Sequence, residues 1–154
     1  MFRMLLSIVS LIGLGSLTAC ISPPSGLNLS LDRPTVHDRY HVAIQSLADP
    51  IAINKMHAWE IRLCSPSGEA VSGARISVDG GMPEHGHGLP TQPRVTRELG
   101  EGRYLLEGMK FSMPGWWEIK LKVVAASGSD DVTFNTIIAP LAAPSTVAGN
   151  AGPH

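Results

Sequence analysis

The residues best suited to chemistry in this chain lie in one glycine-rich segment, residues 80–90, with the sequence GGMPEHGHGLP. Its two histidines, His85 and His87, are separated by one residue, and in extended backbone this spacing places both imidazoles on the same side of the chain. Glycines allow tight turns and close backbone approach, and prolines fix the ends of the segment. The pattern predicts a structured loop that presents two nitrogen donors side by side.

Methionine thioethers accompany these imidazoles. Met82 precedes the histidines, and Met113 lies in a second Met-Pro-Gly turn later in the chain. Imidazole and thioether together suit copper, and the soft thioether favours Cu(I). A zinc site needs three or four His, Cys or carboxylate ligands in tetrahedral order; Glu84 could join such a site, but the methionines would have no role in it. We therefore predict a Cu(I) site centred on His85 and His87.

A structural interpretation of the same residues is the alternative. The imidazoles of the loop can bond to backbone groups, with the glycines needed only for turn geometry, and Met82 can fill a gap in the core. His57 shares a strand face with Trp59, so it is either a ligand at the rim of the site or a histidine at the edge of the core. Both interpretations place these residues in one loop-rich region.

The rest of the chain consists of short runs of alternating apolar and polar residues, separated by turn residues, with no helical period. The runs predict strands at residues 41–47, 56–64, 74–79, 94–99, 103–111, 116–124 and 132–138. About seven short strands predict an all-β protein with an immunoglobulin-like antiparallel β-sandwich, and a small barrel is the alternative. Trp59 and Trp117 alternate with aliphatic residues and are expected to be buried.

The direction of these strands decides which loops meet. Successive strands in such a sandwich run alternately up and down, so Met113 should share one pole with residues 56–57 and 82–90. The opposite pole should hold the loops at residues 66–68, 100–102 and 127–130, which contain no histidine or methionine. The topology thus gathers the candidate ligands at one end of the domain: Met82, His85, His87 and Met113, with His57 at the rim.

The N-terminus has the organisation of an exported bacterial lipoprotein. Residues 1–19 combine a basic start with an apolar run shorter than the roughly 20 residues of a membrane-spanning helix, and we expect them to be a signal peptide. The run ends in Leu-Thr-Ala-Cys, which resembles the lipobox at which a lipid is attached to the cysteine, here Cys20. The next residue is Ile21 rather than Asp, which by the sorting rule of such lipoproteins implies the outer membrane, facing the periplasm.

The predicted domain organisation follows from these ends. Residues 20–40 carry the lipidated cysteine and a flexible tether rich in Ser, Pro, Asn and Asp, residues 41–139 form the folded domain, and residues 140–154 form a disordered tail. With Cys20 lipidated, Cys64 has no partner in the chain and is a buried thiol, an intermolecular disulfide or a ligand. The lipid would anchor the protein to the membrane.

Composition and motifs exclude other classes of function. The net charge is −1 and there is no basic patch, so we expect no nucleic-acid partner. No Ser-His-Asp order, carboxylate pair or phosphate-binding loop is present in the needed context, so we expect no enzyme activity. A binding or interaction module remains.

The same motifs resemble one known family. The sequences MHAW at 56–59, GGMPEHGHGLP at 80–90, GRY at 102–104 and EGMKFSMPGWW at 107–117 are similar to the YtkA-like domain, also called FixH-like. The resemblance implies an immunoglobulin-like fold in the cell envelope and partners among copper proteins or in cytochrome oxidase assembly. It singles out the ligand set already named. We therefore predict a copper-binding module that stores, buffers or delivers the ion. The alternative is a metal-free module that docks an envelope or respiratory complex.

Overall fold

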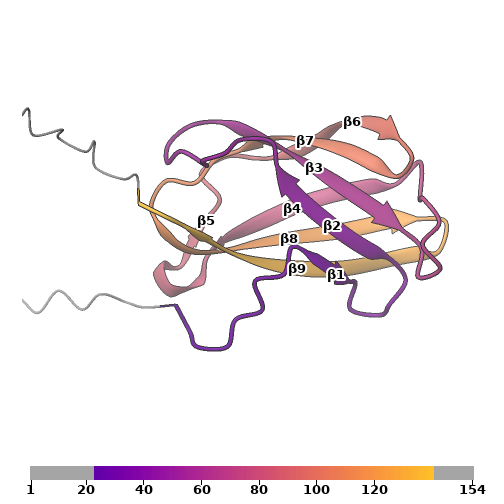
Figure 1. The fold of residues 1–154 in the computed structure, drawn as a ribbon, viewed down its shortest axis with the longest axis horizontal. Coiled ribbons are helices and arrows are strands. Elements are labelled where there is room, and N and C mark those ends of the chain that lie inside the picture. Colours follow the sequence, from indigo (N-terminus) through magenta and orange to yellow (C-terminus); the bar gives the residue numbers. More distant parts are fainter. Residues whose placement is uncertain (1–22, 141–154) are drawn as a thin grey trace, which may run out of the picture.

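The structure is a computed structural model that describes residues 23–140; the predicted signal peptide, Cys20 and the predicted tail beyond residue 140 lie outside this range. The elements are β1 (Asp32–Pro34), β2 (His41–Ser46), β3 (His57–Cys64), β4 (Arg75–Met82), a 3-10 turn η1 (Pro83–His85), β5 (His87–Gly88), β6 (Arg94–Gly100), β7 (Arg103–Met109), β8 (Gly115–Ala125) and β9 (Gly128–Ile138). They form two antiparallel sheets with strand orders β1-β2-β3-β7-β6 and β5-β4-β8-β9 (Figure 1). The sheets pack face to face, and the protein is an immunoglobulin-like β-sandwich, as predicted.

Strict alternation along the central strands creates the core between the sheets. In β8 the inward residues from Trp117 to Val123 are buried, whereas Lys120 and Lys122 between them point to solvent. Trp59 begins an equivalent buried set on β3 in the opposite sheet. The buried side chains of both sheets belong to one hydrophobic cluster, which confirms the predicted inward faces.

The folded domain begins earlier than predicted. The expected tether extended to residue 40, but β1 pairs with β2, and Thr35 and Tyr40 are buried. The tether prediction rested on the low apolar content of this segment, and its polar groups are fixed by hydrogen bonds to the last strand instead. Residues 32–40 are therefore part of the sandwich, and only the residues before β1 precede it.

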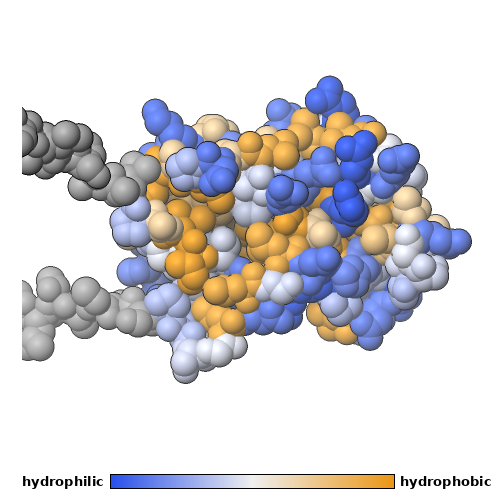
Figure 2. Space-filling model, viewed as in Figure 1, coloured by the Kyte–Doolittle hydropathy of each residue, from blue (hydrophilic) through white to orange (hydrophobic). Residues whose placement is uncertain are grey.

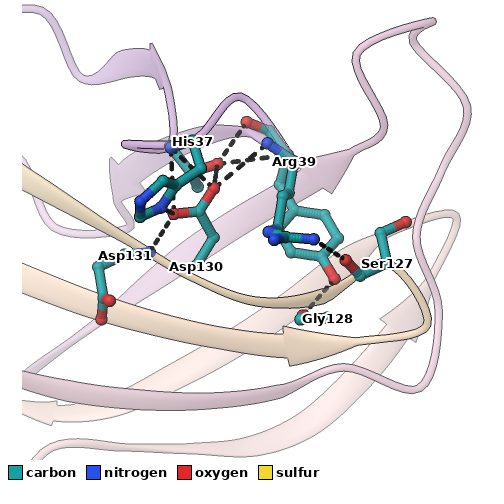
Figure 3. A network of polar contacts seen from close by, with 8 residues as sticks. His37, Arg39, Ser127, Gly128, Asp130 and Asp131 are labelled. Carbon is teal, nitrogen blue, oxygen red and sulfur yellow. Dashed lines mark hydrogen bonds and ion pairs between the residues drawn. The ribbon is translucent and has the colours of Figure 1, made fainter.

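A buried carboxylate, Asp130 on β9, fixes this N-terminal segment (Figure 3). Its oxygens accept hydrogen bonds from the Thr35 hydroxyl at 2.6 Å, from the His37 amide at 3.1 Å and from the Arg39 amide at 3.2 Å. The His37 ring contributes Nδ1 at 2.9 Å, and the amide of Asp131 donates at 2.9 Å. Burial alone would raise the pKa of Asp130, but these hydrogen bonds hold it well below its usual range.

The registers of the strands define the two ends of the sandwich. His57 at the start of β3 pairs with Met109 at the end of β7, and Gly81 at the end of β4 pairs with Glu118 near the start of β8. We call this end, together with η1 and β5, the β5 pole. Figure 1 shows that the first and last described residues lie at this same end. The predicted gathering of candidate ligands at one pole is confirmed. Within residues 23–140, no helix is long and apolar enough to cross a bilayer.

Candidate metal centre

The loop that carries the two histidines is an ordered part of the second sheet. The turn η1 ends at Gly86, whose φ of 62° is in the left-handed region that glycine adopts without strain. The chain then returns along β4, where His87 pairs with Met82 and Gly88 pairs with Gly81. This short hairpin presents the imidazoles of His85 and His87 at the surface of the β5 pole.

The two imidazoles lie side by side as predicted, but the turn at Gly86 brings them together and not extended backbone, because His85 ends η1 and His87 begins β5. The ring centroids of His85 and His87 are 5.9 Å apart, and the ring planes differ by 17°. Both residues are exposed, and neither ring bonds to a backbone group in the part of the chain that the structure describes. The alternative in which these imidazoles bond to backbone is therefore not what the structure shows.

Gly81 makes the close approach of β5 to β4 possible. A Cβ atom at this position would collide with the carbonyl oxygen of His87 and lie 2.9 Å from the Cα of Gly88. Gly88, across the pair, has room for a Cβ, since the nearest atom is the Gly80 oxygen at 3.8 Å. The position of His87 thus depends on one glycine and not on its neighbour.

The two predicted thioether ligands occupy different depths. Met82 is 1% exposed and belongs to the core, whereas Met113 is half-buried and packs against the core from outside. The terminal methyl of Met82 lies 3.0 Å from the position of a Cβ on Gly115, so Met82 packs beneath the turn that carries Met113. The Trp117 indole N–H donates to the Met113 carbonyl at 3.1 Å and holds that turn in place. Met82 fills the core, and Met113 is the thioether nearer the surface.

His57 lies at the edge of the core, where its ring contacts Trp59 and Phe111. Its Nδ1 accepts a hydrogen bond from the Trp59 indole N–H at 2.9 Å, and its ring centroid lies 5.3 Å from that of Phe111. Burial lowers the pKa of His57, so the ring is neutral at pH 7 and carries its proton on Nε2. Nε2 is buried without a hydrogen-bond partner among the described residues. In this arrangement neither nitrogen offers a free lone pair to a metal, which corrects the prediction of His57 as a rim ligand.

The donors at the β5 pole do not make a zinc-type set. Within residues 23–140, no group of three or more His, Cys, Asp or Glu side chains is placed to hold a metal ion. The predicted donors that remain accessible at this pole are the two imidazoles and the half-buried thioether of Met113. Cys64 is half-buried at the other end of β3, beside His41 of β2, and has no disulfide partner among the described residues.

Two features of the molecule had no counterpart in the sequence analysis. The Asp130 network was missed because its hydrogen-bonding partners come from the segment assigned to the tether. The apolar residues Leu47, Met56 and Ile137 are largely exposed and lie at the β5 pole. Alternation places each of them opposite the buried residues of its strand, which agrees with this exposure, but the sequence analysis assigned them no role.

The chain is similar in sequence to a known protein family. The sequence model of the YtkA-like family matches residues 35–122, which is more than half of the chain. The chain belongs to the YtkA-like family. The matched part of this YtkA-like protein contains the histidine hairpin and the turn of Met113.

A solved structure supports the fold independently. A DUF4426 family protein from Pseudomonas aeruginosa PAO1 superimposes with a TM-score of 0.50 and 18% sequence identity, over 66% of this chain and 92% of that chain. At this identity the likeness establishes the β-sandwich alone. A comparison with curated protein sequences found no match.

Proposed function

We propose that this YtkA-like protein binds Cu(I) in the cell envelope and buffers, stores or delivers the ion. The observation that supports the proposal is the parallel, exposed pair formed by His85 and His87. Met113, half-buried in the neighbouring turn, supplies the thioether that makes such a site selective for a soft ion. Cu(I) is stable at low coordination number, so two imidazoles and one thioether are enough to hold it without a further His, Cys or carboxylate from residues 23–140.

The position of the histidines also favours exchange over permanent retention. Both imidazoles are exposed at the end of the sandwich, His85 in η1 and His87 on β5, so a partner protein could reach the ion without unfolding the domain. A structural metal would instead be enclosed by its ligands. Delivery to a copper protein or to an oxidase-assembly factor is the role that this exposure supports.

The proposal includes anchoring of the protein by lipid at Cys20. The apolar run of residues 1–19 and the lipobox-like end support cleavage before this cysteine. The anchored protein would face the periplasm, most simply from the outer membrane. Enzyme activity and nucleic-acid binding form no part of the proposed function.

Removing the imidazoles tests the metal site. In the double variant His85→Ala/His87→Ala, the Cu(I) affinity of the purified protein should fall by more than the roughly 10–100-fold that loss of an outer-shell partner typically costs. Met113→Leu should weaken Cu(I) binding and leave any Zn(II) binding unchanged, because only the soft ion gains from sulfur. Competition with a Cu(I) chelator under reducing conditions measures both effects. Met56→Leu is the matched control, since Met56 is 62% exposed and outside the proposed ligand set.

A second pair of variants tests the hairpin without touching a ligand. Gly81→Ala should displace β5 and reduce Cu(I) affinity, whereas Gly88→Ala should leave it near the wild-type value. Circular dichroism confirms that each variant is folded. Wild-type protein that binds Cu(I) no better than the double histidine variant would contradict the metal proposal and favour a metal-free docking module.

Replacing Cys20 by serine tests the anchor. The variant lacks the thiol that accepts the lipid, so it should leave the membrane fraction or accumulate as uncut precursor. Cell fractionation and the mass of the protein measure this outcome. Cys64→Ser is the control. Cys64 lies within the folded domain, so the protein with this change should remain membrane-bound. A serine variant at position 20 that stays in the membrane at its mature size would contradict lipidation.

A further inference from the structure

Exposed apolar side chains gather at the β5 pole. Leu47 is 58% exposed, Met56 is 62% exposed and Ile137 is 43% exposed. Segments 45–51 and 137–140 border a groove of about 610 Å³ between them. In Figure 2 apolar surface is visible at the end of the molecule where the described chain begins and ends.

The strand registers place this surface at the β5 pole. The amide of Leu47 donates to the carbonyl of Ala58 at 2.9 Å, beside the start of β3. Ile138, next to Ile137, pairs with Gly115 at the start of β8. The apolar groove and the histidine hairpin therefore occupy the same end of the sandwich.

The path of the N-terminal segment brings the proposed anchor to this end. The described part of the chain begins at the β5 pole (Figure 1). Its first residue is Pro23. Three peptide units join it to Cys20, and they span at most about 11 Å even when fully extended.

The residues that follow Pro23 are held against the domain, so they do not lengthen the connection between the domain and Cys20. Pro24 and Leu27 line a shallow groove with Trp116, and the carbonyl of Asn28 accepts a hydrogen bond from the Asn135 side chain at 3.1 Å. A bilayer that holds Cys20 is therefore within about 11 Å of the point where the chain enters the domain. That distance leaves no room for a second protein between this point and the lipid.

We propose that the β5 pole is a membrane-contact surface, on which Leu47, Met56 and Ile137 enter the interfacial layer of the bilayer that anchors Cys20. The inference rests on the lipid anchor of the proposed function and is independent of copper. Apolar side chains that are costly to expose in water are stabilised at such an interface. The histidine hairpin then lies beside the bilayer surface, where a partner held in the same membrane could still reach it, and the other pole faces the periplasm.

The full lipidated protein in phosphatidylethanolamine–phosphatidylglycerol vesicles tests this orientation. In a Cys64→Ser background, an environment-sensitive fluorophore is attached at Asp49→Cys in the groove or at Ser67→Cys in the turn at the opposite pole. We expect a blue-shifted emission at position 49 and quenching by a nitroxide lipid several-fold stronger than at position 67. The mass of the protein shows that Cys20 carries lipid and is not labelled.

Variants of the exposed apolar residues Leu47, Met56 and Ile137, called the apolar patch, show whether this surface contacts the bilayer or whether the lipid alone holds the protein there. Leu47→Ser/Ile137→Ser should abolish the quenching at position 49 while the lipid keeps the protein on the vesicles. Val36→Ser/Val124→Ser replaces exposed valines outside the patch and should leave the quenching unchanged. Inserting a Gly-Ser linker before Pro23 should also preserve the quenching at position 49, because Leu47, Met56 and Ile137 themselves keep this pole in contact with the bilayer.

Two results would overturn the inference and are distinguishable. Equal, weak quenching at positions 49 and 67 in lipidated, vesicle-bound protein would show that the pole is free for a protein partner, with the anchor intact. Protein that carries no lipid and does not bind vesicles would show that the anchor fails, and the inference fails with it. Cu(I) affinity, measured separately, is unaffected by either result.

Discussion

Replacing Trp117 by alanine is expected to lower the free energy of unfolding by about 3–5 kcal/mol, the range typical for loss of a large buried aromatic side chain. Trp117 is fully buried at the start of β8, and its ring packs edge-on against Phe111 with centroids 5.1 Å apart. Such a loss is a large fraction of the total stability of a domain of this size. Urea denaturation followed by circular dichroism measures it.

The same variant should also affect the candidate metal centre, because Trp117 holds the Met113 turn through its indole N–H. Trp117→Phe keeps most of the apolar contact and removes that hydrogen bond, so it should cost less stability than alanine while still loosening Met113. Val124→Ala on the solvent face of β8 is the control. If Trp117→Ala were no more destabilising than Val124→Ala, the assignment of the inward face would be wrong.

Replacing Asp130 by alanine is expected to lower the melting temperature by on the order of 10 °C. The change removes the acceptor of the part-buried amides of His37 and Arg39 and leaves the buried Thr35 hydroxyl with the Tyr40 carbonyl alone. Unpaired buried donors cost more than the hydrogen bonds themselves contribute. Asp131→Ala is the control, because Asp131 is exposed and its side chain takes no part in the network. Equal melting temperatures for the two variants would contradict a structural role of Asp130.

Asp130 also determines how stability depends on acid. Its pKa is lower in the folded protein than in the unfolded chain, where it is about 3.9. The charged carboxylate therefore contributes its full stabilisation above about pH 4–5, and the contribution is lost as pH falls below the unfolded value toward the folded one. Denaturation midpoints between about pH 7 and 2 should fall steeply for wild type below pH 4. They should fall less steeply for Asp130→Asn, which starts from lower stability.

The architecture could be predicted because alternation is a local signal. Each of the predicted strands is present in the structure, and the two missed ones, β1 and β5, are the shortest, with three and two residues. Strands of this length carry no period of their own, and both exist through pairing with a neighbour. The extension of β4 to Met82 was missed for a related reason, because glycines 80 and 81 indicate a turn until the partner strand is known.

The sequence could indicate the two histidines of the candidate site, but it could not indicate how deeply the methionines are buried. The sequence analysis placed both rings on one side by assuming extended backbone, whereas the structure brings them together through a turn with Gly86 in the left-handed region. Whether Met82 or Met113 is accessible depends on packing between sheets, which only the fold supplies. The hydrogen bond that ties His57 to Trp59 joins two residues of one strand, yet nothing in the sequence distinguishes it from a free imidazole.

The direction of β1 has a mechanical consequence. The chain enters at the β5 pole, and β1 lies in the half of the sandwich away from it and runs toward the opposite pole, since Asp32 pairs with Ala43 and Pro34 with His41, which in turn pairs with Cys64 at the end of β3. A pull on the N-terminus toward the membrane is directed along the strand axis, so it loads the bonds between β1 and β2 in shear, all at once. In addition, the Arg33 guanidinium donates a hydrogen bond to the Thr133 carbonyl of the other sheet at 2.7 Å, and the Thr35 hydroxyl donates one to Asp130. Force applied through a lipid anchor is thus shared by both sheets before any strand can peel away.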